Sequence, residues 1–137
     1  MSERDNVELV KGLYSAFVQG DMQALLGLFA DDLDFRHPMP QSIWPWAGTR
    51  RGRQGVAEFF AGLSETLEYE RVEPQEFIAQ NDRVAVLLFE RTRVKATGVV
   101  FEISEVHVYK LRNGKVVQLM VFEDTAPIIA ALHGYRR

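Results

Sequence analysis

Three titratable side chains of this sequence occupy positions that predict burial. His37 ends an alternating run, LDFRH, and Glu105 and His107 belong to the more apolar, odd-numbered positions of residues 99–112. Because successive side chains of a strand point to opposite faces, all three are expected to face the interior. A buried carboxyl or imidazole group is costly without a partner, so these groups should meet one another or a ligand.

These residue types favour proton transfer. An imidazole group titrates near pH ~6.5, so it can remove and return protons near neutral pH. We assign His37 the role of general base, acting on a carbon acid or on an attacking water. His107, oriented by Glu105, would donate a hydrogen bond to the oxygen on which charge develops.

The segment that starts at His37, HPMPQSIWPWAG, is rich in Trp and Pro for a surface loop. Rigid aromatic side chains that follow an inward-facing His predict a lid over an apolar pocket. The side chains expected to bind the substrate come from this loop and from the predicted helices and strands, and they are Tyr14, Phe35, Met39, Trp44, Trp46, Phe101 and Tyr109.

Simpler interpretations of the same residues stay open. Each inward-facing His could be a core residue bonded to a backbone carbonyl, and Glu105 could be only a structural partner of His107. Tyr14 could be a core aromatic residue, and the two Trp could fill a dimer interface. The basic residues after the loop are expected to form a solvated turn, and they are Arg50, Arg51 and Arg53. Two functions without catalysis also stay open: binding of an apolar ligand, and a role as an interaction domain.

Composition limits the classes of protein. A chain of 137 residues is predicted to form one domain, residues 1–137. Its net charge of -3 provides no basic surface, so we expect no nucleic-acid partner. With no Cys and three well-separated His, neither a metal ion nor a cofactor is expected. The chain shows no signal peptide and no apolar stretch of membrane-spanning length, so we expect no membrane association and a cytoplasmic location.

The spacing of apolar residues predicts helices first and strands later. Helical spacing is found in residues 4–19, 22–30, 55–67 and 125–134. One short strand is predicted at residues 33–37, between the second and third of these helices. Extended runs cover residues 69–79, 83–95, 99–112 and 115–124. Asn113-Gly114 between the last two is a strong hairpin signal. This order predicts an α+β fold in which three helices and a short C-terminal helix pack on a curved, mostly antiparallel sheet.

The opposite face of the predicted strand 99–112 is also apolar. Val100, Val106 and Val108 occupy even-numbered positions, which point away from the interior. An apolar outer face of this kind is compatible with a homodimer formed through the sheet.

Three segments of the chain stand out together: GDMQALLGLFADDLDFRHP, WAGTRRGRQGVAEFF and VHVYKLRNGKVVQLMVFEDTAPIIAAL. In this order they resemble the SnoaL-like and ketosteroid-isomerase-like families of the nuclear-transport-factor-two-like superfamily, over nearly the whole chain. The resemblance implies a cone-shaped α+β barrel, often dimeric, with an apolar cavity between sheet and helices. The superfamily includes isomerases, polyketide cyclases, dehydratases, epoxide hydrolases and members of no known activity.

The resemblance also implies roles for particular positions. The proton-moving carboxylate of the isomerases, which precedes a Pro, matches His37, and their oxyanion-stabilising acid matches His107. Their helix-one Tyr matches Leu13, while Tyr14 lies one residue away, about 100° around the helix. These departures argue against steroid isomerase activity. They leave an isomerase, cyclase or dehydratase type of acid–base reaction on an apolar, carbonyl-bearing ring compound as the expected function. The Asp-Arg-Asp group of the epoxide hydrolases has only poorly spaced candidates, which are Arg91, Glu105 and Asp124.

Overall fold

The first helix begins at a reciprocal cap. In the computed structural model, which describes residues 1–135, α1 (Glu3–Gln19) follows Ser2, whose hydroxyl accepts a hydrogen bond from the Asp5 N–H. The Asp5 carboxylate accepts one from the Ser2 N–H in return. This pair satisfies two backbone donors that the helix itself leaves unpaired. The apolar residues of α1 that are buried are Val10, Leu13, Tyr14 and Ala16, whereas Val18 is exposed.

The second helix is shorter than its spacing predicts. Asp21 caps it as expected by accepting from the Ala24 N–H, but α2 (Met22–Gly27) ends before residues 28–30. Strand β1 (Phe29–Arg36) begins there instead, because Phe29 pairs with Val116 in the sheet. A short apolar run fits a helix or a strand equally well, and here the neighbouring strand decides.

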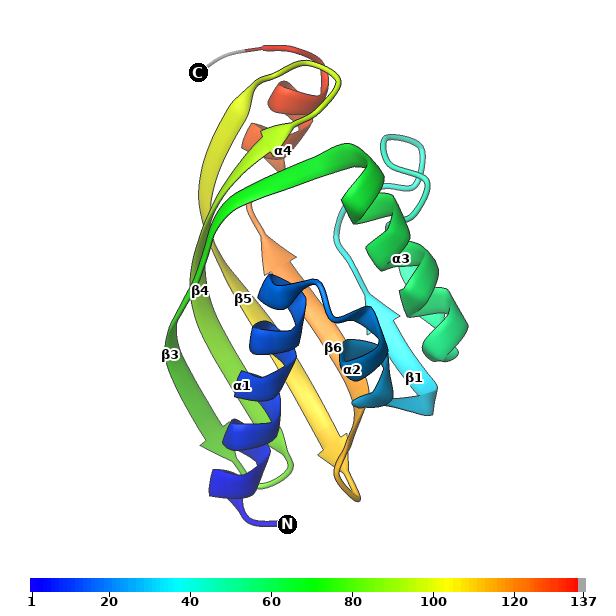
Figure 1. The fold of residues 1–137 in the computed structure, drawn as a ribbon, viewed down its shortest axis with the longest axis vertical. Coiled ribbons are helices and arrows are strands. Elements are labelled where there is room, and N and C mark those ends of the chain that lie inside the picture. Colours follow the sequence, from blue (N-terminus) through cyan, green and yellow to red (C-terminus); the bar gives the residue numbers. More distant parts are fainter. Residues whose placement is uncertain (136–137) are drawn as a thin grey trace.

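Six strands form one sheet in the order β2-β1-β6-β5-β4-β3. The strands other than β1 are β2 (Thr49–Arg51), β3 (Leu67–Gln80), β4 (Arg83–Val94), β5 (Val100–Arg112) and β6 (Lys115–Glu123). Every neighbouring pair is antiparallel except β1 and β6, which are parallel. The sheet curves strongly and stays open between its edge strands β2 and β3 (Figure 1). The short edge strand β2 has no counterpart in the sequence prediction.

The hairpin between β5 and β6 forms where the sequence predicts it. Asn113 has a φ of 52° and Gly114 a φ of 74°, and both values lie in the left-handed region. A two-residue turn with positive φ at both positions matches the right-handed twist of its strands. Beyond the turn, a register shift between Lys110 and Leu111 brings Glu105 opposite Glu123 and His107 opposite Val121.

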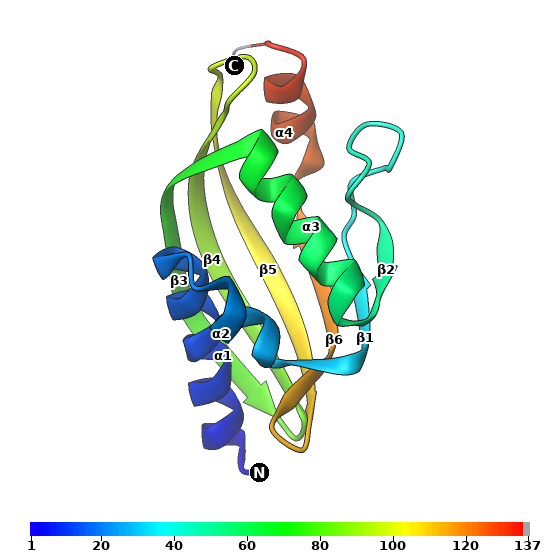
Figure 2. The same ribbon diagram turned by 45° about the vertical axis from the view of Figure 1, so that its right-hand side comes forward.

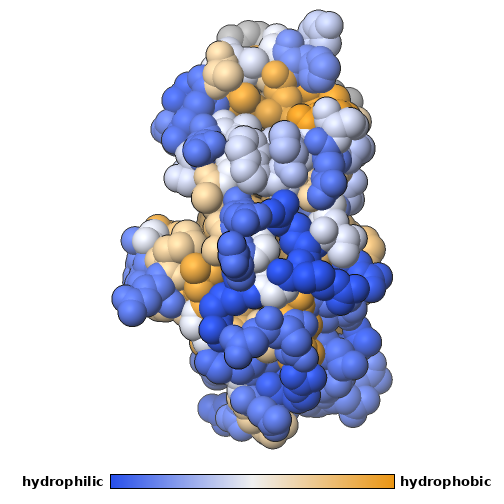
Figure 3. Space-filling view, turned by 90° about the vertical axis from the view of Figure 1, so that its right-hand side faces the viewer, coloured by the Kyte–Doolittle hydropathy of each residue, from blue (hydrophilic) through white to orange (hydrophobic). Residues whose placement is uncertain are grey.

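The helices cover the concave face of the sheet. Helices α1 and α3 (Gly52–Thr66) lie across it, while the short α4 (Thr125–Leu132) closes one end beside β5 (Figure 2). The predicted α+β arrangement, with three helices and a short C-terminal one, is thus confirmed. On the side that carries α3 and β1 the surface is mostly hydrophilic, and apolar side chains gather towards the end where α4 lies (Figure 3). No helix within residues 1–135 is long and apolar enough to cross a membrane.

The loop after β1 packs against α3 at a residue without a side chain. A Cβ atom on Gly62 would lie 2.3 Å from the ring of Trp46. Replacing Gly62 by Ala is therefore expected to lower the melting temperature. The displaced ring costs roughly 1–3 kcal/mol, more than the ~1 kcal/mol that Ala contributes to a helix. Gly12→Ala in α1 is the matched control, because its Cβ would have nothing within 4 Å, and it should raise the melting temperature. Thermal unfolding in which both variants gain stability would contradict this packing.

Candidate functional site

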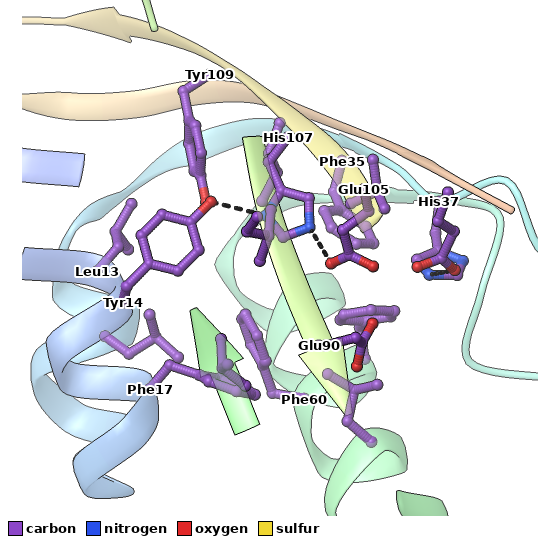
Figure 4. Close-up of a pocket in the computed structure, with 18 of the residues that line it drawn as sticks. Leu13, Tyr14, Phe17, Phe35, His37, Phe60, Glu90, Glu105, His107 and Tyr109 are labelled. Atoms are coloured by element: carbon purple, nitrogen blue, oxygen red, sulfur yellow. Dashed lines mark hydrogen bonds and ion pairs between the residues drawn. The ribbon is translucent and has the colours of Figure 1, made fainter. Parts of the chain in front are cut away.

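A cavity of about 100 Å³ lies between the concave face of the sheet and helices α1 and α3. Its wall is mostly apolar and aromatic, and titratable side chains line one side (Figure 4). The predicted site residues that line it are Tyr14, Phe35, His37, Glu105, His107 and Tyr109.

A second cavity of about 30 Å³ adjoins the first. His37 lines both cavities, and so do Glu90 and Glu123, which the sequence analysis did not select. The predicted residues that line only the smaller cavity are Met39, Trp44 and Phe101. Trp46 lines neither cavity. It packs on α3 and against the ring of Trp44, with 5.8 Å between ring centroids.

The loop 38–48 is held in place over the smaller cavity. The Trp44 Nε1–H donates to Thr66 Oγ1 at the end of α3, over 3.1 Å, and Trp44 is only 6% exposed. The His37 N–H donates to the Gly48 carbonyl at the other end of the loop. The loop packs through its buried residues Met39, Trp44 and Ala47, while Pro38, residues 40–43 and Pro45 are exposed.

Two of the three Arg expected in a solvated turn are structural instead. Arg50 donates to the Gly55 carbonyl over 2.7 Å, and Arg53 donates to the Phe29 carbonyl over 2.9 Å. Arg50 thus ties β2 to the backbone of α3, and Arg53 ties α3 to the backbone of β1. Only Arg51, whose side chain is 72% exposed, fits the expectation.

A chain of hydrogen bonds crosses the larger cavity wall. The Tyr109 hydroxyl donates to the Tyr14 hydroxyl over 2.9 Å, and the Tyr14 oxygen lies 2.8 Å from His107 Nδ1. Because Tyr14 already accepts from Tyr109, its own hydrogen points to Nδ1, so the proton of a neutral His107 sits on Nε2. That Nε2–H then donates to Glu105 Oε1, 2.8 Å away. Tyr14 therefore joins the polar network, although the resemblance placed Leu13 at the helix-one position.

Burial decides the protonation of His107 and Glu105, which are neighbours in this series of hydrogen bonds. It lowers the pKa of His107 to about 4, so the ring is neutral near neutral pH. It raises the pKa of Glu105 to about 8, and the nearby charge of Glu123 acts in the same direction. Glu105 therefore holds a proton over much of the neutral range and can donate a hydrogen bond.

His37 has no free lone pair in this arrangement. The Met39 N–H donates to His37 Nδ1 over 3.2 Å, so the proton of a neutral ring sits on Nε2. That nitrogen lies 2.9 Å from Glu123 Oε1. Burial, the largest single influence, raises the pKa of Glu123, but the hydrogen bond and charge of His37, with smaller contributions from Glu105 and His107, together lower the net pKa. Glu123 is thus an ionised carboxylate next to a protonated one.

Three buried carboxyl groups meet at this point. Glu90, Glu105 and Glu123 each offer an oxygen atom within 4.8 Å of the others. Glu90 is 5% exposed, and its Oε2 accepts from the Thr92 hydroxyl. Burial raises the pKa of Glu90, and the charge of Glu105 raises it further. Within residues 1–135 this is the group of side chains whose spacing could hold a metal ion.

The sequence did contain signals for both missed acids. The inward residues of β4 alternate as Val84, Val86, Leu88, Glu90, Thr92 and Val94. Leu119, Val121 and Glu123 alternate in the same way on β6. The alternation test that selected Glu105 on β5 therefore also applies to these strands.

The group expected for an epoxide hydrolase does not come together. Arg91 pairs with Glu70 over 2.8 Å on the outer face of the sheet, and the Asp124 carboxylate caps α4. Glu105 alone of the three candidates lines the cavity.

The fold and the site define a class of protein: an α+β cone around an apolar cavity that carries acidic and imidazole groups on one wall. Solved structures of this class are similar over nearly the whole chain. An NTF2-like protein from Burkholderia xenovorans LB400 is 36% identical, with a TM-score of 0.86, and the match covers 96% of this chain and 98% of that one. An NTF2-like protein of unknown function from Burkholderia pseudomallei is 30% identical, with a TM-score of 0.87 and the same coverage.

TerC, co-crystallised with polyporic acid, is 28% identical, with a TM-score of 0.82, over 94% of this chain and 98% of TerC. The family model of the SnoaL-like domain matches residues 10–119. The chain therefore belongs to the SnoaL-like family, as the resemblance predicts. Among curated proteins, none matches the chain.

Proposed function

We propose that the protein catalyses a cofactor-free acid–base reaction, of isomerase, cyclase or dehydratase type, on an apolar ring compound that bears a carbonyl group. The observation that carries the proposal is the pair Glu105 and Glu123. These neighbouring buried carboxyl groups have environments that move their pKa values in opposite directions. A pair of acids separated in this way can supply one general base and one general acid.

In this mechanism Glu123 removes a proton from the carbon next to the carbonyl group. Glu105, in its neutral form, donates a hydrogen bond to the oxygen on which negative charge develops. His37 is a positioning residue that keeps Glu123 ionised, and His107 holds Glu105 through Oε1. The proposal therefore gives the base role to Glu123, the carboxylate that His37 contacts, whereas the sequence analysis gave it to His37.

The lining of the cavity supports an apolar, single-ring substrate. Rings of Phe17, Phe59 and Phe60 surround the space opposite the acids. A volume of about 100 Å³ is of the order of the ~150 Å³ cavity that binds benzene. The relative TerC, co-crystallised with polyporic acid, supports a small organic ligand for this chain too.

Cyclopentanone is a suitable first probe, because exchange of its α-hydrogens reports proton transfer without knowledge of the natural substrate. We expect the protein to accelerate the exchange in D₂O, followed by NMR, by at least tenfold over buffer. Exchange at the buffer rate across a panel of small cyclic ketones that bind would contradict the catalytic proposal. It would favour the alternative, a binding module for apolar ligands.

A second copy of the chain is the other partner that we propose. Phe122 is 53% exposed on the outer face of the sheet, directly opposite Val106 on the neighbouring strand. Large exposed apolar side chains on a sheet face favour an interface between two copies, which the molar mass in solution will test. The cytoplasmic location expected from the sequence remains part of the proposal.

A further inference from the structure

The buried acids differ from the surface acids in their partners. On the surface, carboxylates pair with guanidinium groups, as in Arg93 with Glu68 and Arg112 with Asp32. No Arg or Lys is among the side chains that line either cavity. Glu90, Glu105 and Glu123 therefore meet without a cationic side chain beside them.

One oxygen of this cluster is without any partner. Glu105 Oε1 accepts from His107, but Oε2 is buried and has no hydrogen-bond partner among residues 1–135. Glu105 as a whole is 8% exposed. Figure 4 shows its free oxygen turned away from His107, towards the side where Glu90 and His37 lie. A buried carboxyl oxygen without a hydrogen-bond partner is costly. This oxygen carries the proton of neutral Glu105 and becomes an acceptor when Glu105 is ionised, so it is free to bond a ligand.

The spacing of the three carboxyl groups suits a particular donor. Oxygens that all lie within 4.8 Å of one another leave a point no farther than 4.8 Å/√3, about 2.8 Å, from each of them. Charge-assisted N–H···O hydrogen bonds are about 2.7–2.9 Å long. A primary ammonium group carries three N–H donors and no acceptor, so it can bond three carboxylates at once.

The aromatic lining of the cavity favours a ligand whose remaining part is hydrocarbon. The aromatic rings of Phe17, Phe59, Phe60 and Tyr69 line the same cavity as the acids. Aromatic faces attract organic cations and bury hydrocarbon. A divalent metal ion takes oxygen ligands at about 2.0–2.6 Å, which this spacing also allows, but it would leave the apolar part of the cavity unused.

We propose that this cavity binds apolar primary amines as ammonium ions, with the nitrogen among Glu90, Glu105 and Glu123 and the hydrocarbon part among the aromatic rings. Such an amine occupies the space of the carbonyl compound and competes with it. Binding requires the acids to be ionised, so protons held by the cluster are released when the amine binds. This inference does not depend on turnover.

Isothermal titration calorimetry with benzylamine tests the proposal, with benzyl alcohol as the neutral probe of the same shape. At pH 7 we expect benzylamine to bind at least tenfold more tightly than benzyl alcohol. Titrations in two buffers of different ionisation enthalpy should show release of protons. Glu90→Gln should weaken benzylamine binding at least tenfold and leave benzyl alcohol unchanged, while Glu102→Gln, an exposed acid on the same sheet, should change neither.

Three outcomes would overturn the proposal. They are equal affinity for the two probes, benzylamine binding that survives both Glu90→Gln and Glu105→Gln, and saturable Mn²⁺ binding without benzylamine binding. Two substitutions, Glu90→Gln and Glu105→Gln, are used so that the test still works if one variant misfolds. Thermal unfolding shows which variants are folded. Calorimetry measures binding and not turnover. Absence of amine binding would therefore contradict this inference but not the proposed reaction, which the ketone-exchange experiment tests separately.

Discussion

Glu123→Gln is expected to reduce the rate of α-hydrogen exchange by at least about 100-fold. The amide keeps the size of the side chain and can still contact His37, but it cannot accept a proton from carbon. General bases of this kind contribute on the order of 10²–10⁴ to a rate. NMR of cyclopentanone in D₂O measures the loss directly.

Two further substitutions separate the roles of the acids. Glu105→Gln should cost much less than Glu123→Gln, because an amide N–H still donates to the developing oxyanion. Glu102→Gln on the outer face of β5 should leave the rate unchanged, since Glu102 contacts Arg91 and not the cavity. Full activity in Glu123→Gln together with loss in His37→Ala would return the base role to His37.

The fold could be predicted where local pattern and tertiary structure agree. The Asn113-Gly114 turn forms the predicted hairpin between β5 and β6, although a register shift between Lys110 and Leu111 changes the pairing beyond the turn. The pattern failed at residues 28–30, because pairing with Val116 decides between helix and strand. It also missed β2, which has three residues and exists through its contact with β1.

For the site, the sequence predicts only which side chains face the interior. Alternation indicates that His37, Glu105 and His107 face inward, and all three line the cavity. Alternation does not predict which ring nitrogen of His37 is available to accept a hydrogen bond. That depends on the N–H of Met39 and on Glu123, which lie on a loop and on another strand. The chemical role of His37 is therefore a property of the tertiary structure, and no pattern within β1 contains it.

The wild-type protein is expected to lose stability as the pH rises from about 6.5 to 8. The folded state holds the Glu105 proton up to about pH 8, against an ordinary pKa of 4.5, so its contribution is complete below pH 4.5 and declines up to pH 8. The depressed pKa of His107, about 4 against 6.5, acts oppositely and is lost as pH falls from 6.5 to 4. The two trends offset each other between pH 4.5 and 6.5, so the decline above 6.5 reports the acid cluster.

The size of that decline follows from linkage between proton binding and folding. One proton held over about 1.5 pH units corresponds to about 2 kcal/mol in the free energy of unfolding. Urea unfolding at pH 6.5 and pH 8 measures it. Glu105→Gln removes one titrating group and should reduce the slope over this window, leaving any part that comes from Glu90, whose pKa burial also raises. Glu102→Gln should keep the wild-type slope. A wild-type curve that is already flat would mean that Glu105 is ionised throughout. In that case the cluster would offer no neutral acid, and the oxyanion would depend on another donor in the same chain, the Nε2–H of His107.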